Sequence, residues 1–382
     1  MTQKTTSPLK VLHVLPSLDV GGIEKGIVDI YQELAPQNYQ FDVLIEKESD
    51  SMLAHRIKAL GGTVHIGGRF KSWGFLMHFM RCVQQNGPYD AVHSHCYYFS
   101  GLVMALAFFA KVPRRIAHIH SANRARKRSL LASCYYRALK LLMDVFATHI
   151  LAVSTVSAQS FAEGRWQKHK KIALRPMGVD FSAFTAAAPE QAPLLTELGI
   201  EGEAKCIVHV GRFTQEKNQH FIVDLFRSLY EMGVVSHLVL IGDGPLKAAL
   251  ENDAEVAPLV LSGAIIFTGL RDDCPALLSA LQGRGLFVFP SLYEGFGLAA
   301  VEAQCAGLPV LASDHVPDAV GIIPHYFKQL SLSAPISAWC DAAQDLFECK
   351  GLSAAQCKEY MQDSGLSVQD AAADLRRYYD AV

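Results

Sequence analysis

The sequence predicts an α/β fold of two doubly wound parallel-sheet domains, and three observations lead to this fold class. Short apolar runs rich in β-branched and aromatic residues alternate with amphipathic helical patterns. The alternation breaks at an Ala- and Pro-rich stretch that ends at Pro193, and then it resumes. With 382 residues, 50% of them hydrophobic, the chain can bury two cores. We therefore expect two sets of βαβ units, each with its own parallel sheet.

The first domain is predicted over residues 1–175. Its strands are expected at Val11–Leu15, Phe41–Ile45, Thr63–Ile66, Ala91–Ser94, Arg115–His120, Ile150–Val153 and Ile172–Arg175. Helical patterns lie between them, for example at Ile23–Leu34, Phe75–Asn86 and Ser129–Met143. The longest apolar run, Gly101–Ala110, is too short to cross a bilayer and is expected to be a core helix.

The second domain is predicted over residues 176–366, after the linker segment that starts at Arg175. Its strands are expected at Cys206–Val210, His237–Ile241, Ile265–Thr268, Leu286–Phe289 and Val310–Ala312. Doubly wound domains bind ligands at the carboxyl ends of their strands. We therefore expect the two domains to face each other across a ligand-binding cleft.

Charge is distributed unevenly along the chain. Residues 1–175 carry 23 Lys and Arg against 11 Asp and Glu, whereas the remainder carries 12 against 26. This polarity indicates that the first domain faces an anionic membrane surface or an anionic acceptor, although chance surface composition would give the same totals. Nucleic acid is not an expected partner.

The cysteines and the first residues indicate the compartment. The nine cysteines form no C-x-x-C pair and no His/Cys cluster at zinc spacing, so reduced thiols in a cytoplasmic protein are expected. The first apolar run is cut by Pro16 and is too short for a secretory signal. The protein is expected to be cytoplasmic, with at most a peripheral contact at the inner membrane face, and to need no metal or cofactor.

The segment Ser291–Leu298 is the most informative part of the chain. It follows the apolar run Gly285–Phe289 and leads into a helical pattern that starts at about Gly297. A strand, a glycine turn and a helix start form an anion site, because first-turn amides lack intrahelical acceptors and the helix dipole favours negative charge. Two carboxylates, Glu294 and Glu302, would be out of place beside phosphate alone but suit a ligand with hydroxyl groups. The segment therefore predicts a sugar-nucleotide site.

A second motif, Gly211–Asn218, follows the strand Cys206–Val210. Arg212 offers a planar fork for bidentate phosphate contact, and Lys217 adds a compact positive charge. Asn218 can cap the helix that follows. The motif could hold a diphosphate and stabilise a departing nucleoside diphosphate, although a solvated arginine and an unrelated surface lysine would look the same in sequence.

Two further glycine segments follow predicted strands. Gly21 and Gly22 allow the backbone to approach a ligand closely at a helix start, although a plain tight turn explains them equally well. Gly242–Pro245 is interpreted as a structural strand-to-helix turn close to the ligand. Neither segment has the G-x-G-x-x-G spacing of dinucleotide binding.

Histidines end two predicted strands of the first domain. His118 and His120 share one face of a strand, and His93 and His95 end the preceding strand, so all four could be buried structural histidines. A basic run follows His120 and includes Arg124, Arg126 and Lys127. This run is either a solvated helix face or a site for an acceptor phosphate or an anionic lipid.

These segments together resemble glycosyltransferase family 4. The resemblance rests on GGIE near the start, the strand end at His120, GRFTQEKN, GDGP, and EGFGLAAVEAQCAGLPV with its E-x₇-E spacing, and it runs from about residue 10 to 313. The flanking YDAVHSH, PSLYEGFGL and LSLSAPISAW resemble the bacterial capsule and exopolysaccharide branch. The resemblance implies the GT-B fold of two Rossmann-like domains, with a final helix, about residues 367–382, that packs back on the first domain.

The resemblance also implies roles for matching residues. Arg212 and Lys217 would bind the donor diphosphate with the help of backbone amides, Glu294 would contact the transferred sugar, and Glu302 would contact the ribose. The helping amides would be those around Phe296, Gly297 and Leu298. On the acceptor side, Gly21 and Gly22 would line the cleft, and His120 would lie beside the reacting sugar.

The implied reaction retains the anomeric configuration. Without a dedicated nucleophile, front-side attack is the expected course, and positioning and stabilisation of the leaving diphosphate would provide the catalysis. The sequence has no D-x-D motif, so the two basic side chains are expected to replace a metal. The predicted donor is a UDP-sugar and the predicted acceptor a lipid-linked saccharide. The alternatives are a GDP-mannose donor, a nucleotide-sugar epimerase and a non-catalytic nucleotide-sugar sensor, and a nicotinamide dehydrogenase ranks last.

Overall fold

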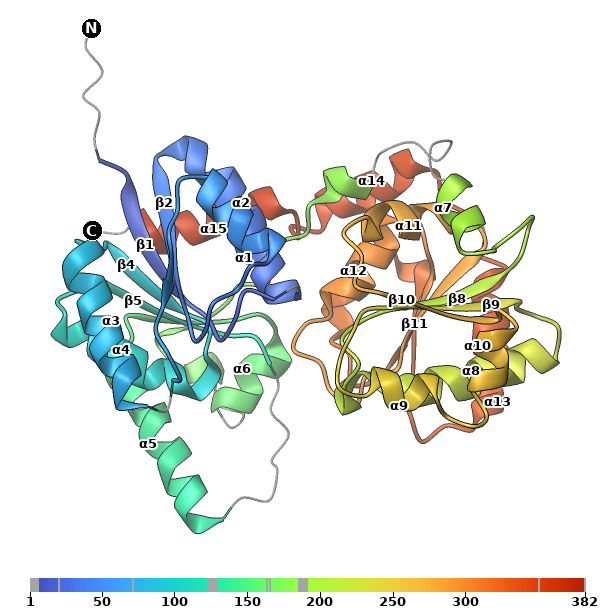
Figure 1. The fold of residues 1–382 in the computed structure, drawn as a ribbon, viewed down its shortest axis with the longest axis horizontal. Helices are drawn as coiled ribbons and strands as arrows, with labels where there is room; N and C mark the ends of the chain where they lie inside the picture. Colours follow the sequence, from blue (N-terminus) through green and yellow to red (C-terminus); the bar gives the residue numbers. More distant parts are fainter. Residues whose placement is uncertain are drawn as a thin grey trace, which may run out of the picture. The chain divides into compact units, whose positions relative to one another are not determined.

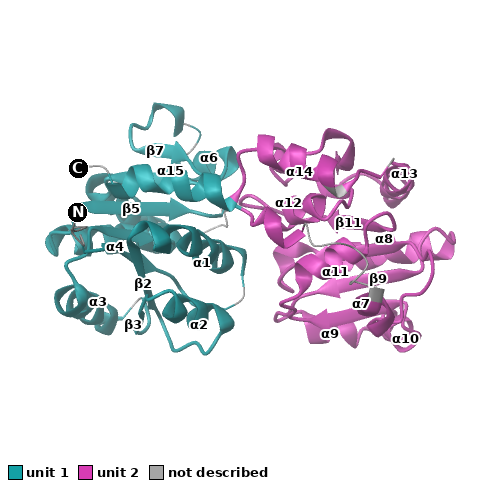
Figure 2. Cartoon of the chain, turned by 90° about the horizontal axis from the view of Figure 1, so that it is seen from above, with its two compact units in different colours: residues 1–178, 368–382 teal, residues 179–367 magenta. Residues whose placement is uncertain are grey.

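The computed structural model describes residues 7–19, 21–70, 72–121, 129–162, 164, 166–184, 192–349 and 351–380. The chain forms two compact units, one of residues 1–178 with 368–382 and one of residues 179–367 (Figure 2). It passes between the units at residues 178–179 and again at 367–368. Beside these crossings Val179 forms a parallel bridge with Ser367, and its amide donates to the carbonyl of Leu366 at 2.9 Å.

Unit 1 contains a seven-stranded parallel sheet in the order β3-β2-β1-β4-β5-β6-β7 (Figure 1). The strands are β1 (Leu9–Val14), β2 (Tyr39–Ile45), β3 (Val64–Ile66), β4 (Ala91–Ser94), β5 (Arg114–Ile119), β6 (His149–Ala152) and β7 (Ile172–Leu174). The helices are α1 (Gly22–Leu34), α2 (Met52–Ala59), α3 (Trp73–Asn86), α4 (Ser100–Phe109), α5 (Leu130–Phe146), α6 (Thr155–Ala162) and α15 (Val368–Asp380).

The two faces of this sheet differ in chemistry. One face is apolar, with Leu12, Val92 and Ala117 packed in a core with α3 and α4. Side chains alternate between faces along a strand, so the residues next in sequence point to the other face. These are His13, His93 and His118, and all three are buried. The last helix, α15, covers this polar face beside α1 (Figure 1), and the hydroxyl of Tyr379 lies 2.7 Å from Nδ1 of His93.

Unit 2 contains a six-stranded parallel sheet in the order β10-β9-β8-β11-β12-β13. The strands are β8 (Cys206–Val210), β9 (His237–Ile241), β10 (Ile265–Gly269), β11 (Gly285–Phe289), β12 (Val310–Ser313) and β13 (Phe327–Leu330). The helices are α7 (Ala192–Glu197), α8 (Gln219–Glu231), α9 (Lys247–Glu251), α10 (Ala257–Leu261), α11 (Cys274–Ala280), α12 (Leu298–Cys305), α13 (Ile336–Phe347) and α14 (Ala354–Asp363). The fully buried Trp339 of α13 packs with α8 and the central strands.

Each sheet has a point where the strand order reverses. In unit 1 this point lies between the paired strands β1 and β4, and in unit 2 it lies between the paired strands β8 and β11. Chain connections leave such a pair toward opposite sides, which opens a crevice at the carboxyl ends where α/β proteins bind ligands. The segments after these four strands are therefore the structural candidates for a site.

The predicted fold class is confirmed, and the expected strands all form. Ala91–Ser94, Cys206–Val210 and His237–Ile241 have the predicted bounds, and the others differ by one or two residues at one or both ends. The edge strand β13 (Phe327–Leu330) was not predicted, because its sequence FKQL lacks the apolar run of the central strands. Among the described residues, no helix is long and apolar enough to cross a membrane.

Candidate active site

Two loops meet at the strand-order reversal of unit 2. One follows β8 and carries Lys217, and the other follows β11 and carries Glu294. The Nζ atom of Lys217 lies 2.5 Å from Oε2 of Glu294, and both side chains are largely buried, with 22% and 16% exposed. Nζ also lies 4.7 Å from the centroid of the Phe289 ring, close enough for a cation–π contact. The structure thus brings together two of the residues that the sequence predicted for the site.

Further bonds connect the same two loops. The hydroxyl of Tyr293 donates to Oε1 of Glu216 at 2.5 Å, and the amide of Leu292 donates to the Glu216 carbonyl at 2.8 Å. The hydrogen bond from Tyr293 lowers the pKa of Glu216, so this carboxyl stays ionised. Glu216 and Tyr293 lie within the predicted motifs but were not predicted as site residues. Each stands next to a predicted site residue, Lys217 or Glu294, and that position was the available signal.

Asn218 acts differently from the prediction. It occupies the N-cap position of α8 in a left-handed conformation, with φ 55° and ψ 44°, but its side chain does not cap the helix. Its Nδ2 donates instead to the carbonyl of Pro290 at 3.2 Å. The predicted side-chain cap is therefore wrong, because the left-handed turn directs the amide toward the β11 loop. Asn218 is a further bond between the two loops.

Glycines allow the close approach of these segments. Gly297, at the N-cap of α12, has a φ of 102°, and a Cβ atom there would lie 3.1 Å from Phe289 and 3.3 Å from Glu294. Gly242 has a φ of 133°, and a Cβ atom would lie 2.2 Å from the carbonyl oxygen of Gly211. At Gly244 a Cβ atom would lie 2.5 Å from the Phe213 carbonyl oxygen. The Gly242–Pro245 turn is thus structural, and it supports the backbone that carries Arg212.

The remaining predicted donor residues lie on the same β8 and β11 loops and on α12. Arg212 is exposed, and no hydrogen bond or ion pair joins its guanidinium to the described residues. Phe296 and Gly297 are buried, and Leu298 begins α12. Glu302 is half-buried in the second turn of α12. The β11 loop and the start of α12 thus offer first-turn amides and carboxylates, and the β8 loop offers one exposed guanidinium. Together these groups suit a ligand with phosphates and hydroxyls.

In unit 1 Gly21 and Gly22 follow β1, at the other strand-order reversal, and His120 follows β5, the neighbour of β4. Gly21 precedes the first residue of α1 in extended conformation, and Gly22 begins the helix. His120 follows β5 directly and is half-buried, with Nε2 2.8 Å from Nδ1 of His95. The basic residues Arg124, Arg126 and Lys127 lie outside the described residues.

Among the described residues, two groups of three histidines have ligand atoms close enough together to hold a metal ion. His13, His93 and His95 form one group of three, and His95, His118 and His120 form another, with ligand nitrogens within 4.8 Å of one another in each. Burial, followed by the charge of His118, lowers the pKa of His13 to about 3, and burial lowers the pKa of His118 to about 4. Burial also depresses the pKa values of His93, His95 and His120. These imidazoles are therefore neutral near pH 7.

Family comparisons follow the two units. Residues 20–183 match the family model described as Glycosyltransferase Family 4, and residues 192–363 match the model described as Glycosyl transferases group 1. The chain is a family 4 glycosyltransferase. The family predicted from the motifs is thereby confirmed.

Curated relatives of this glycosyltransferase cover most of its length. It is 29% identical over 339 residues to the putative glycosyltransferase EpsF of Bacillus subtilis, covering 88% of this chain and 87% of that one. It is 23% identical over 354 residues to CapH of Staphylococcus aureus, described as a capsular polysaccharide biosynthesis glycosyltransferase, covering 90% and 92%. A third relative, from Escherichia coli, is 26% identical over 323 residues, covering 82% and 81%, and is described as UDP-Gal:alpha-D-GlcNAc-diphosphoundecaprenol alpha-1,3-galactosyltransferase. These names agree with the predicted capsule and exopolysaccharide branch.

Solved structures confirm the GT-B fold of the glycosyltransferase. HepE of Anabaena, crystallised in complex with UDP and glucose, superposes with a TM-score of 0.78 at 19% identity, covering 98% of this chain and 100% of that one. At this identity the likeness shows the fold alone. Both units of the glycosyltransferase belong to that shared architecture.

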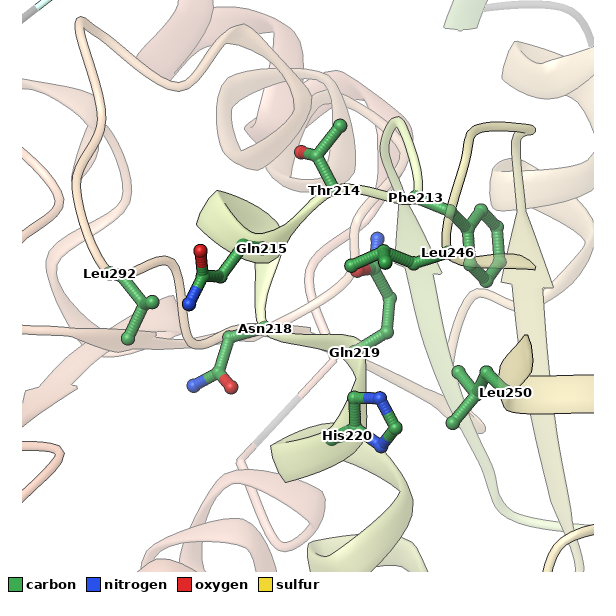
Figure 3. Close-up of a pocket in the computed structure, with 9 residues that line it drawn as sticks. All are labelled: Phe213, Thr214, Gln215, Asn218, Gln219, His220, Leu246, Leu250 and Leu292. Carbon is green, nitrogen blue, oxygen red and sulfur yellow. The ribbon is translucent and has the colours of Figure 1, made fainter. Parts of the chain in front are cut away.

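A pocket of about 230 Å³ lies next to the β8 loop of the glycosyltransferase (Figure 3). Its lining comes from the β8 loop and the start of α8, from the segment after β9, and from the β11 loop. The residues are Phe213, Thr214, Gln215, Asn218, Gln219, His220, Leu246, Leu250 and Leu292. Arg212, Lys217 and Glu294 are not among them, so this pocket is a neighbour of the Lys217–Glu294 site and not its centre.

Proposed function

We propose that this glycosyltransferase moves a hexose or an N-acetylhexosamine from a UDP-sugar to a lipid-linked saccharide in capsule or exopolysaccharide biosynthesis. The observation that carries the proposal is the Lys217–Glu294 pair at the strand-order reversal of unit 2. A cation and a carboxylate in contact match the two halves of a sugar nucleotide, since its diphosphate needs positive charge and its sugar needs acceptors for hydroxyl groups.

The roles of the donor-site residues follow from this chemistry. Arg212 and Lys217 bind the diphosphate, together with the first-turn amides around Phe296, Gly297 and Leu298. Glu294 accepts hydrogen bonds from the transferred sugar. Glu302, one turn further along α12, accepts them from the ribose. When the diphosphate arrives, Lys217 exchanges its contact with Glu294 for phosphate oxygens, and Glu294 then turns to the sugar.

The proposed reaction is a front-side displacement with retention. The acceptor hydroxyl oxygen forms a bond to the anomeric carbon while the bond from that carbon to the diphosphate oxygen breaks. The hydroxyl proton passes to the leaving diphosphate, which departs as the nucleoside diphosphate. Arg212 and Lys217 stabilise the negative charge that develops on the leaving group, so no metal is needed to hold it. Gly21, Gly22 and His120 belong to the acceptor side, with His120 beside the reacting sugar.

A lipid-linked acceptor requires access to a membrane, and α5 supports this part of the proposal. This helix carries a row of exposed apolar side chains, and further exposed apolar side chains lie at the end of α4, which packs against α5. The row consists of Leu131, Tyr135, Leu141 and Val145 on α5 with Phe108 and Phe109 on α4. Arg137 and Lys140 stand within the same helix, whereas its acid, Asp144, lies 3.2 Å from His169. Apolar side chains flanked by basic ones favour the surface of an anionic bilayer, here at the cytoplasmic face.

The relatives support the nature of the substrates. The E. coli relative is named for a UDP-galactose donor and a diphosphoundecaprenol-linked acceptor, and the alignment covers 82% of this chain. Nothing in the β8 and β11 loops reads the base of the nucleotide, so GDP-mannose is the competing donor. An epimerase and a nucleotide-sugar sensor remain the alternatives to transfer.

Thermal unfolding with UDP-, GDP- and ADP-sugars, followed by turnover assays, tests the proposal. We expect UDP-sugars to raise the unfolding temperature of the wild type and to raise that of Glu294→Ala less. We further expect transfer in EDTA to a synthetic undecaprenyl-diphosphate sugar, with an α-configured product by NMR. Stabilisation by GDP-mannose alone would assign the competing donor. Epimerised sugar without acceptor, or binding without any turnover, would reject the transferase.

A further inference from the structure

Five histidines of unit 1 form one continuous cluster of rings. His13 lies in β1, His93 and His95 lie in and just after β4, and His118 and His120 lie in and just after β5. The register pairs His13 with His93, and alternate residues of a strand share a face, so all five reach the side that α15 covers. Neighbouring ring centroids are 4.2 to 5.3 Å apart along the series of contacts.

Three of these rings are joined nitrogen to nitrogen. Nδ1 of His13 lies 3.0 Å from Nε2 of His95, and Nδ1 of His95 lies 2.8 Å from Nε2 of His120. The other two rings bond elsewhere: Nε2 of His118 donates to the Arg175 carbonyl at 3.0 Å, and Nδ1 of His93 lies 2.7 Å from the Tyr379 hydroxyl. His13, His95 and His120 therefore form a separate hydrogen-bonded series within the cluster.

The chemistry of neutral imidazole restricts this series. A neutral ring has one N–H donor and one bare acceptor nitrogen, and His95 uses both of its nitrogens. If His95 donates to His120, the proton of His120 must be on Nδ1, and His13 must donate to His95. If instead His120 donates to His95, Nδ1 of His120 is bare, and His13 carries an unused N–H on Nε2. These are the two arrangements that keep both bonds.

The ends of the series decide between the arrangements. Nε2 of His13 and Nδ1 of His120 are both buried and have no hydrogen-bond partner among the described residues. The His13 side chain is only 1% exposed on the face that α15 covers, whereas His120 is half-buried at the carboxyl edge of the sheet. A buried N–H without a partner is rarer in proteins than a buried acceptor without one. The arrangement with a bare nitrogen at His13 and an N–H at His120 is therefore favoured, because only the His120 end lies at the carboxyl edge of the sheet, where a bound ligand could accept the N–H.

Two other histidines show that this fold accommodates a bare buried nitrogen. The carbonyls of Arg175 and Val288 accept from Nε2 of His118 and from Nδ1 of His209, so these nitrogens carry the protons. The second nitrogen of each ring, Nδ1 of His118 and Nε2 of His209, is bare and has no partner among the described residues. An unpaired acceptor at His13 would be a third case of the same kind.

We propose that His95, which His13 holds in register, fixes His120 as the Nδ1–H tautomer, so that His120 meets its ligand as a hydrogen-bond donor and not as a base. His95 is thus a positioning residue. The proposal rests on the proposed function only for the ligand, which is an oxygen atom of the reacting sugar or of the acceptor. The proton leaving the acceptor hydroxyl then cannot pass to His120, which agrees with its transfer to the departing diphosphate.

Nitrogen-15 NMR of the ligand-free enzyme with labelled histidines tests the proposal, because imidazole nitrogen shifts distinguish the tautomers. The His120 signals are assigned by their loss in His120→Gln. We expect a protonated Nδ1 and a bare Nε2 on His120 in the wild type. In His95→Leu we expect the signals to move toward the Nε2–H tautomer that free histidine prefers, and His95→Gln, with a donor and an acceptor, should restore the wild-type shifts. His93→Gln, outside the series, should leave them unchanged.

Three results would overturn the proposal. The first is an Nε2–H tautomer on His120 in the wild type, which decides the matter even if no variant folds. The second is an unchanged His120 signal in folded His95→Leu. The third is one equivalent of a transition metal in the purified enzyme, measured by elemental analysis, because metal ligation would replace the hydrogen bonds. None of these readings requires turnover, so failure of the proposed transfer reaction would be seen separately.

Discussion

Lys217 and Glu294, which are 77 residues apart in sequence, contact each other at 2.5 Å between the β8 and β11 loops. Two hydrogen bonds act with this pair, one from Tyr293 to Glu216 and one from Asn218 to the carbonyl of Pro290. Together they hold the two loops in one arrangement before any ligand arrives. A site that is organised in advance spends less binding free energy on ordering its side chains. The contact also keeps the positive charge of Lys217 at the position where the proposed donor needs it.

Loss of Lys217 should affect catalysis more than folding. We expect Lys217→Ala to lower kcat by about 10²–10³-fold, as when one electrostatic donor to a developing charge is removed. A matched control is Lys205→Ala, because Lys205 also forms an ion pair with a glutamate of unit 2, Glu348, at 3.3 Å. Lys205 precedes β8 and therefore lies at the amino end of the strand, away from the candidate site. Steady-state kinetics with a saturating donor would measure both variants. Equal losses in both would contradict a catalytic role for Lys217.

The Gly242 turn should be intolerant of a side chain. Gly242→Ala adds a Cβ atom 2.2 Å from a backbone oxygen at a φ of 133°, so we expect a loss of about 2–4 kcal/mol in the free energy of unfolding. Gly263→Ala is the control, since Gly263 also has a positive φ of 80° but nothing within 4 Å of a Cβ atom, and it should cost about 1–2 kcal/mol. Urea unfolding compares the two, and similar losses would show that contact with Gly211 does not matter.

Unit 1 should lose stability in mild acid. The pKa of His13 is about 3 in the fold, and an unfolded histidine titrates near 6.5. Below pH 6.5 the unfolded chain binds a proton that the folded chain does not, so stability is full above that pH and falls as the pH decreases toward about 3. Each such histidine contributes about 1.4 kcal/mol per pH unit in this window.

Substitution separates this effect from general acid sensitivity. His13→Leu should reduce the slope of unfolding free energy against pH by about 1.4 kcal/mol per unit between pH 6 and pH 4. His55→Gln, at a side chain that is 62% exposed, controls for the loss of a histidine from the surface. Urea titrations at several pH values supply the slopes. An unaltered slope in folded His13→Leu would mean that His13 titrates normally in the native protein.

Membrane contact through α5 should depend on its apolar row. Leu131 and Leu141 are 86% and 62% exposed, so Leu131→Glu with Leu141→Glu should leave the fold intact and weaken sedimentation with anionic vesicles at least tenfold. The matched control is Leu261→Glu, at an exposed apolar position in unit 2. Equal binding of the wild type to neutral and anionic vesicles would reject an electrostatic contribution to membrane binding. A wild-type dimer that the double variant disrupts would assign the row to a second copy of the chain.

Much of the fold was predictable because parallel strands are buried on both faces. Runs such as Leu286–Phe289 are therefore continuous and apolar, and the turns after them carry glycines. The edge strand Phe327–Leu330 was missed for the same reason, since its residues are only half-buried and half of them are polar. Local pattern thus predicts central strands better than edge strands.

Residues of the candidate site could be predicted one by one from the sequence, but their geometry could not. The spacing within each loop indicated Lys217 and Glu294 separately, but their contact depends on the pairing of β8 with β11, which brings the two strand ends together. The histidine series could not be predicted from the sequence either, because it too depends on strand pairing. His13 gave no local signal, and its bond to His95 arises from the pairing of β1 with β4.

Isothermal titration with UDP in the presence of EDTA tests the central claim most directly, namely that the β8 and β11 loops hold a nucleotide diphosphate without a metal. The wild type should bind UDP, Arg212→Ala and Lys217→Ala should each bind at least tenfold more weakly, and Lys205→Ala should bind as the wild type does. Unchanged UDP affinity in Arg212→Ala and Lys217→Ala, or wild-type binding that disappears in EDTA, would contradict the claim.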